Sequence, residues 1–165
     1  MKQVKIVFTA LLCCCFINYS QAQEKKAAPY TATYTSSFAM GKAAQADIVL
    51  NMWKDWDDNA FDRHDYFADT IKLIMADSIV IKGKAAVIEA GKKYRGAMSS
   101  AKSVVHAFIP LYSTDKKEYM VCIWGTETDT YADGRMETKD LHEVWWFNSA
   151  GKISSMRQWT ARFAE

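Results

Sequence analysis

The stretch Asp140–Trp159 places charged residues among large aromatic side chains. These are the residues of this chain whose types are best suited to catalysis or ligand binding. Glu143 shares one strand face with Trp145 and Phe147, because alternate residues of a strand point to the same side. Desolvation by those rings would raise the pKa of the carboxyl, as a proton-donating acid requires. The opposite face of the strand offers an alternative pocket set of His142, Val144 and Trp146.

The other titratable residues do not converge in the sequence. His64, His106 and His142 fall on separate expected elements, without His-x-His or His-x-x-x-Glu spacing, so no metal site is predicted. One acidic run lacks the glycine and terminal glutamate of a calcium loop and indicates a solvated, helix-capping segment: Asp55, Asp57, Asp58, Asp62 and Asp65. No glycine-rich phosphate loop or nucleophile elbow is present, so neither a nucleotide nor another cofactor is expected.

The periodicity of apolar residues predicts the elements that must position these groups. A helix is expected over residues 39–57, a short second helix over 62–67 and a third over 84–98. Strands are expected over 71–75, 79–81, 103–112, 117–130, 136–147 and 153–163. The short turns between the last four strands favour an antiparallel sheet, so the predicted class is α+β. The helices would cover one face of the sheet and a second subunit the other.

The N-terminus has the pattern of a secretory signal peptide over residues 1–22. A basic start precedes an apolar segment that is too short to span a bilayer, and Ser20-Gln21-Ala22 supplies a cleavage site. Cys13, Cys14 and Cys15 raise a lipoprotein alternative, which the bulky or cysteine residue before each of them disfavours. A flexible leader is expected over 23–37 and one folded domain over 38–165, in the periplasm or outside the cell.

Composition bounds the partners of such a mature chain. Residues 1–22 hold two lysines and no acidic residue, so their removal takes the formal charge from +2 to zero. Neither nucleic acid nor an anionic membrane surface is therefore an expected partner. The six tryptophans supply flat apolar surface that suits a core, a subunit interface or a ring-shaped ligand.

Three short motifs resemble the nuclear-transport-factor-2-like (NTF2-like) superfamily, which includes SnoaL-like polyketide cyclases, ketosteroid isomerases and limonene epoxide hydrolase. They are Phe67-Ala-Asp69, Gly83-Lys-Ala-Ala-Val87, and Phe147–Ile153 followed by Met156-Arg157. The resemblance covers about residues 39–163. It implies three N-terminal helices packed on a strongly curved antiparallel or mixed sheet that encloses a conical pocket, often in a dimer.

The resemblance to ketosteroid isomerases implies two catalytic carboxyl groups. Asp77 matches their general base, and Glu143 matches their protonated acid, which donates to a developing oxyanion; that acid is also a standard example of a carboxyl kept neutral by an apolar site. The tyrosine that those enzymes use from the first helix is missing, and Asn51 lies in the matching region. The alternative is structural, with Asp77 starting a turn and Glu143 pairing with a lysine.

The resemblance to limonene epoxide hydrolase is less complete in its functional groups. Glu127 matches one of the two acids, but Gln158 replaces the second and Gly125 replaces the arginine. Glu127 and Gln158 are therefore expected to line the pocket and orient a ligand.

Two functions are compatible with these features. The first is a homodimeric module that binds a small, largely apolar or ring-shaped molecule, and the second is an isomerase- or cyclase-like enzyme that uses Asp77 and Glu143. The expected ligand-binding residues are Asn51, Trp53, Trp56, Glu127, Trp145 and Gln158.

Overall fold

The structure is a computed structural model that describes residues 29–34 and 38–162. The expected signal peptide and most of the expected leader lie outside these residues. Every described helix and strand lies within residues 34–165, which form one compact unit. No helix in the described part of the chain is long and apolar enough to cross a membrane.

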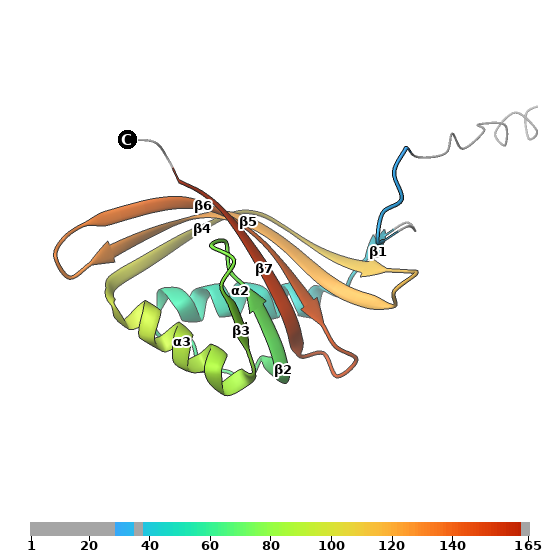
Figure 1. Cartoon of the computed structure of the whole chain (residues 1–165), viewed down its shortest axis with the longest axis horizontal. Helices are drawn as coiled ribbons and strands as arrows, with labels where there is room; N and C mark the ends of the chain where they lie inside the picture. Colours follow the sequence, from blue (N-terminus) through green and yellow to red (C-terminus); the bar gives the residue numbers. More distant parts are fainter. Residues whose placement is uncertain (1–28, 35–37, 163–165) are drawn as a thin grey trace, which may run out of the picture. The chain divides into compact units, whose positions relative to one another are not determined.

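This unit is one curved, seven-stranded sheet with two helices on its inner face (Figure 1). The helices are α2 (Ala43–Asp57) and α3 (Lys84–Gly96). The strands are β1 (Phe38–Met40), β2 (Phe67–Ile74), β3 (Val80–Lys82), β4 (Met98–Ser113), β5 (Glu118–Tyr131), β6 (Met136–Phe147) and β7 (Ile153–Arg162). This arrangement confirms the predicted α+β class.

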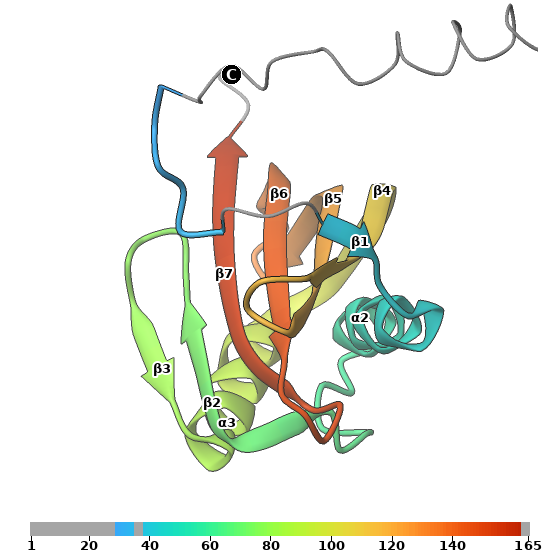
Figure 2. The same cartoon turned by 90° about the vertical axis from the view of Figure 1, so that its right-hand side faces the viewer.

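The sheet is mixed, because one of its strand pairs is parallel. The strand order is β1-β4-β5-β6-β7-β2-β3, and β2 runs parallel to β7 while all other neighbours are antiparallel (Figure 2). Register shifts interrupt β4 between Val105 and Ala107 and the β6–β7 pair between Trp146 and Phe147. Such irregularities bend strands, so they help the sheet to curve around the helices.

The predicted short helix over residues 62–67 is absent, so the described residues form two helices where three were expected. Asn59 has a φ of 56° that ends the first helical segment, and Phe67 already belongs to β2. Between them, buried Asp55 binds Arg63 Nη1 at 2.9 Å and His64 Nδ1 at 2.6 Å. These contacts stabilise an irregular connection between α2 and β2. The sequence pattern predicts instead that the polar residues there cap helices.

The other two predicted helices are real but shorter than expected. Residues 38–40 form β1, which pairs with the end of β4, so α2 begins only at Ala43. Met98 pairs with Tyr131 as the first residue of β4, so α3 ends at Gly96. In both cases long-range strand pairing overrides a local helical pattern.

Alternation along β5 and β6 separates the inner face of the sheet from the outer face. Val121, Ile123 and Trp145 are buried on the inner face, where they meet Val49 and Trp53 of α2. Burying each of the aliphatic side chains contributes roughly 1.5–3 kcal/mol. On the outer face Trp124, His142 and Trp159 stack in a row across β5, β6 and β7, with ring centroids 4.8 and 5.2 Å apart.

Candidate functional site

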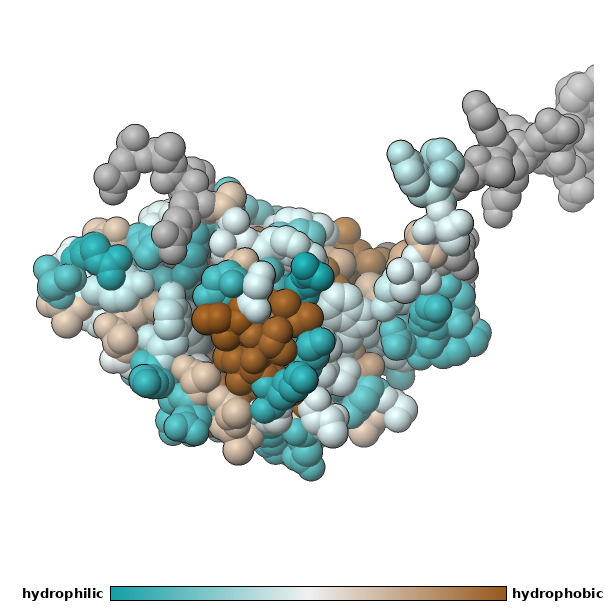
Figure 3. All heavy atoms as spheres, viewed as in Figure 1, coloured by the Kyte–Doolittle hydropathy of each residue, from teal (hydrophilic) through white to brown (hydrophobic). Residues whose placement is uncertain are grey.

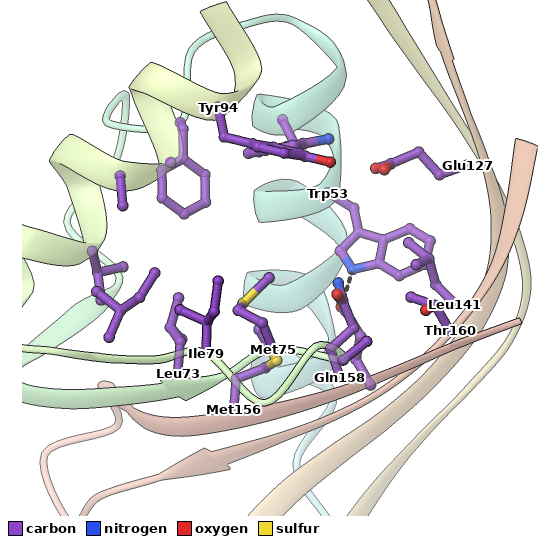
Figure 4. A pocket seen from close by; sticks show the side chains of 18 of the residues that line it. Trp53, Leu73, Met75, Ile79, Tyr94, Glu127, Leu141, Met156, Gln158 and Thr160 are labelled. Carbon is purple, nitrogen blue, oxygen red and sulfur yellow. Dashed lines mark hydrogen bonds between the residues drawn. The ribbon is translucent and has the colours of Figure 1, made fainter. Parts of the chain in front are cut away.

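A cavity of about 910 Å³ lies between the inner face of the sheet and helices α2 and α3 (Figure 4). Small-molecule pockets commonly measure roughly 300–1,000 Å³ and are mostly apolar. Its aromatic lining residues are Trp53, Trp56, Phe61, Tyr94 and Trp145. Its larger aliphatic and methionine lining residues are Met52, Leu73, Met75, Ile79, Ile81, Val87, Leu141 and Met156. Its polar lining residues are Asp77, Lys93, Ser103, Glu127, Glu137, Lys139, Glu143, Gln158 and Thr160.

Apolar side chains also reach the surface beside this cavity. Ile79 and Val80 are 56% and 46% exposed, on the hairpin that β2 and β3 form. Figure 3 shows apolar atoms gathered on this side of the molecule. Because Ile79 lines the cavity as well, the cavity has an apolar margin at the edge of the sheet.

Glu143 is fixed at the cavity wall by three N–H donors. Its Oε2 accepts hydrogen bonds from Trp53 Nε1 at 2.8 Å and Trp145 Nε1 at 3.0 Å, and its Oε1 accepts one from Gln158 Nε2 at 2.8 Å. The three donors come from α2, β6 and β7, and Figure 4 shows the bond from Trp53. The carboxyl therefore holds the helix and two strands in fixed relation.

Burial raises the pKa of Glu143, and the three donors only partly oppose that shift. The residue is 4% exposed, and the donors that contact it are neutral. Its carboxyl thus holds a proton more tightly than an exposed glutamate does. The predicted alternative that Glu143 pairs with a lysine does not describe these bonds, since two indoles and an amide occupy both oxygens.

A second polar group lies further along the same face of the sheet. Lys139 Nζ is 2.8 Å from Glu127 Oε1 and 2.8 Å from Asp129 Oδ2, and the two acidic side chains are 7% and 0% exposed. Burial opposes the charge on Lys139, but the two carboxylates outweigh it and the pKa of Lys139 is raised. Burial raises the pKa of Glu127 to about 7, although Lys139 acts against that shift.

This pKa makes the stability of the protein depend on pH. The ordinary value for Glu127 is 4.5, so the folded state keeps its proton over a range in which the unfolded state has lost it. We expect the free energy of unfolding to fall as pH rises from about 5 to about 8. Glu127→Gln should reduce this slope in urea denaturation, and Glu89→Gln on the exposed side of α3 should not. An unchanged slope in Glu127→Gln would contradict the shifted pKa.

The structure brings most of the predicted site residues to this one cavity. Both predicted catalytic residues line it, as do five of the six predicted ligand-binding residues: Asp77, Glu143, Trp53, Trp56, Glu127, Trp145 and Gln158. Asn51 does not line the cavity, because its side chain is exposed to solvent on α2. Asp77 is exposed, and its Oδ1 accepts a hydrogen bond from the backbone N–H of Ile79 at 3.0 Å, as a residue that starts a turn would.

The strand face that lines the cavity is the one that carries Glu143 and Trp145, and the alternative face carrying His142 points outward. The three histidines are separate: His64 contacts Asp55, His106 contacts Thr126, and His142 stacks between tryptophans. Within residues 29–34 and 38–162, no three His, Cys, Asp or Glu side chains are grouped to hold a metal ion.

Sequence reasoning missed Lys139, Asp129 and Tyr94 as parts of the polar end of the site. Period two places Lys139 on the face of Glu143, and Asp129 on the face of Glu127, so this signal was available. Tyr94 lies on α3, and its ring faces the cavity in Figure 4. The pairing of Glu127 with Lys139 depends on the β5–β6 register, which the sequence alone does not specify.

No protein-family model and no curated protein matches this chain. Solved structures do match it. One is an NTF2-like protein of unknown function from Cytophaga hutchinsonii, with 19% identity and a TM-score of 0.55 over 73% of this chain and 100% of that one. Another is a LEH-like epoxide hydrolase from M. tuberculosis, with 12% identity and a TM-score of 0.60 over 72% and 84% of the two chains.

A third match is a hypothetical protein with a ketosteroid isomerase-like fold from Catenulispora acidiphila, in complex with trimethylamine. It has 12% identity and a TM-score of 0.54, over 68% of this chain and 84% of that one. At such identities the likeness concerns the fold alone. This chain has the NTF2-like fold, as the sequence motifs indicated.

Proposed function

We propose that the protein binds a small, largely apolar molecule in the cavity between its sheet and helices. The observation that carries the proposal is the lining: aromatic and aliphatic side chains form most of it, and polar groups gather around Glu127 and Glu143. An apolar cavity with a few fixed polar groups is the usual form of a small-molecule site. The solved neighbour that holds trimethylamine supports the view that this fold accommodates small molecules.

A thermal-shift screen of the protein against steroids, polyketide-like rings, terpenes and fatty acids tests this function. A ligand at a hundred times its Kd should stabilise the folded state by about 2.7 kcal/mol. For a domain of this size the melting temperature should rise by several degrees. No shift from any of the four classes would count against a small apolar ligand and direct attention to protein partners.

A second candidate function is proton transfer, isomerase- or cyclase-like, with Asp77 as base and Glu143 as acid or oxyanion donor. Two observations favour it: both carboxyl groups line the same cavity, and burial raises the pKa of Glu143. An exposed Asp77 and a protonated Glu143 would be suited to opposite roles. Asp77→Asn and Glu143→Gln should then each abolish turnover of a bound ring ketone while the fold persists. Normal turnover in both variants would end this reading.

We propose further that the outer face of the sheet joins two copies of the chain. Its exposed apolar residues include Val104, Ile109 and Trp159, alongside the stacked Trp124 and His142. An exposed apolar surface of this kind is unfavourable in a monomer. Sedimentation equilibrium should give twice the chain mass, and Trp159→Glu should give the monomer mass.

Export remains a proposal that rests on the sequence pattern of residues 1–22. The intact mass of the protein purified from a secreting host should correspond to a chain that starts at Gln23. A mass that retains residues 1–22 would overturn it.

A further inference from the structure

The polar end of the cavity carries an excess of buried acidic groups. Glu127, Asp129 and Glu143 are 5%, 0% and 4% exposed, and Lys139 is the cation that contacts two of them. Glu143 is bound by two indoles and an amide, which are neutral groups. Because burial favours the uncharged form of Glu143, the excess lies in Glu127 and Asp129, two carboxyl groups that share one ammonium group. Buried negative charge without a counter-charge is costly, so this arrangement favours a cationic partner.

Asp129 provides a second observation on the charge of this group. Its side chain is fully buried on the inner face of β5, and Lys139 takes only one of its two oxygens. Within the described part of the chain, Oδ1 has no hydrogen-bond partner. A buried carboxylate oxygen normally accepts a hydrogen bond, so the charge of Asp129, which does not itself line the cavity, is incompletely compensated beside Glu127 and Lys139.

Aromatic rings adjoin this acidic group on the cavity side. Figure 4 shows the phenol oxygen of Tyr94 pointing toward the carboxyl of Glu127, with the indole of Trp53 nearby. Trp56 stacks on Tyr94 with ring centroids 6.1 Å apart, and Lys139 Nζ already lies 5.9 Å from the centroid of Tyr94. The face of an aromatic ring attracts an ammonium group, as the ring of Tyr94 already does with Lys139.

We propose that the ligand of this cavity is a protonated amine on an apolar body, with its ammonium group at Glu127 and its body against Leu73, Met75 and Ile79. The inference rests on the proposed binding function and names the ligand class for that site. An ammonium group supplies N–H donors and one positive charge, which together suit a carboxylate such as Glu127 that shares its one ammonium partner with Asp129. A carboxylate ligand would add further negative charge beside Glu127 and Asp129, and an alcohol would leave the excess in place.

The affinity for such an amine should depend on pH in a defined direction. Glu127 is faced by Lys139 and Glu143 of β6, by its β5 neighbour Asp129 and by the phenol of Tyr94 from α3. Burial raises its pKa to about 7, so its negative charge develops as pH passes through neutrality. Alkyl amines stay protonated to about pH 10. Binding should therefore strengthen between about pH 6 and pH 8 and release a proton at the lower pH.

The test is calorimetric titration of the full chain with three matched probes: 1-naphthylmethylamine, 1-naphthalenemethanol and 1-naphthoate. At pH 8 the amine should bind at least about tenfold more tightly than the alcohol, and the acid should bind least. Glu127→Gln should remove the preference for the amine while alcohol binding persists. Glu89→Gln, on the exposed side of α3, should keep the preference.

Each alternative result has a defined meaning. Equal binding of amine and alcohol to the unaltered protein would overturn the amine inference and leave the binding function standing. Retention of the full amine preference by folded Glu127→Gln would overturn it as well, because the ammonium group would then lie elsewhere. Absence of binding by all three probes, together with an empty thermal-shift screen, would reject the amine inference and the binding function together.

Discussion

Glu143→Leu is expected to lower the free energy of unfolding by about 3 kcal/mol or more, because it leaves three buried N–H donors without an acceptor. The indole N–H groups of Trp53 and Trp145 and the amide of Gln158 now share its two oxygens at 2.8–3.0 Å. Leucine has a similar volume but accepts no hydrogen bond, so each donor would lose its partner without regaining water. Urea denaturation at constant pH measures the loss.

Glu143→Gln is the matched variant for this prediction. Its amide oxygen can still accept from the two indoles, while its NH₂ group faces a Gln158 amide that is free to turn over. It also removes a buried carboxyl whose pKa burial has raised. We expect a loss of less than about 1.5 kcal/mol, since the hydrogen bonds are kept and the glutamine amide, like a protonated carboxyl, is uncharged. A Glu143→Leu protein as stable as Glu143→Gln would show that the three bonds contribute little.

Gly125→Ala should be the most damaging single-methyl substitution in the sheet. A Cβ at Gly125 would lie 2.5 Å from the carbonyl oxygen of Val104 and 2.7 Å from the ring of Trp53. The carbonyl belongs to the neighbouring strand β4, so it moves only if the β4–β5 pairing is distorted. We expect a loss of about 3 kcal/mol, at the upper end of the usual range for overpacking.

Gly96→Ala is the control for this substitution. Nothing lies within 4 Å of a Cβ placed at Gly96, and the residue is at the end of α3. It should leave the melting temperature unchanged or raise it slightly, because alanine restricts the unfolded chain. A melting temperature for Gly125→Ala within about 1 °C of the unaltered protein would contradict the close approach of Trp53 to β5.

Gly125 also shows what the sequence comparison could and could not predict. The resemblance to limonene epoxide hydrolase places Gly125 at the position where that enzyme has an arginine. The physical reason for a glycine at this position is visible only in the fold. There the ring of Trp53 packs against the backbone of β5, and its indole N–H donates to Glu143. The strand pattern of β6 was predicted to the residue, because its alternation of apolar and polar residues is regular.

The remaining differences arise where distant segments decide the local structure. Residues 62–67 were predicted to be helical, but the ion pairs of Asp55 and the entry of Phe67 into β2 exclude that helix. Asn51 was chosen by position in the first helix, and the direction in which it points depends on which side of α2 meets the sheet. Burial of neighbouring Met52 and Trp53 turns Asn51 toward solvent.

The most direct test of the central claim is to fill the cavity. Ala90 lines it on α3, whereas Ala86, one turn earlier, is exposed and outside the lining. We would measure the thermal shift that the best screening ligand produces in Ala90→Trp, Ala86→Trp and the unaltered protein. The account predicts a shift of several degrees in the last two and none in Ala90→Trp. A folded Ala90→Trp protein that the ligand stabilises as much as the unaltered protein would contradict binding in this cavity.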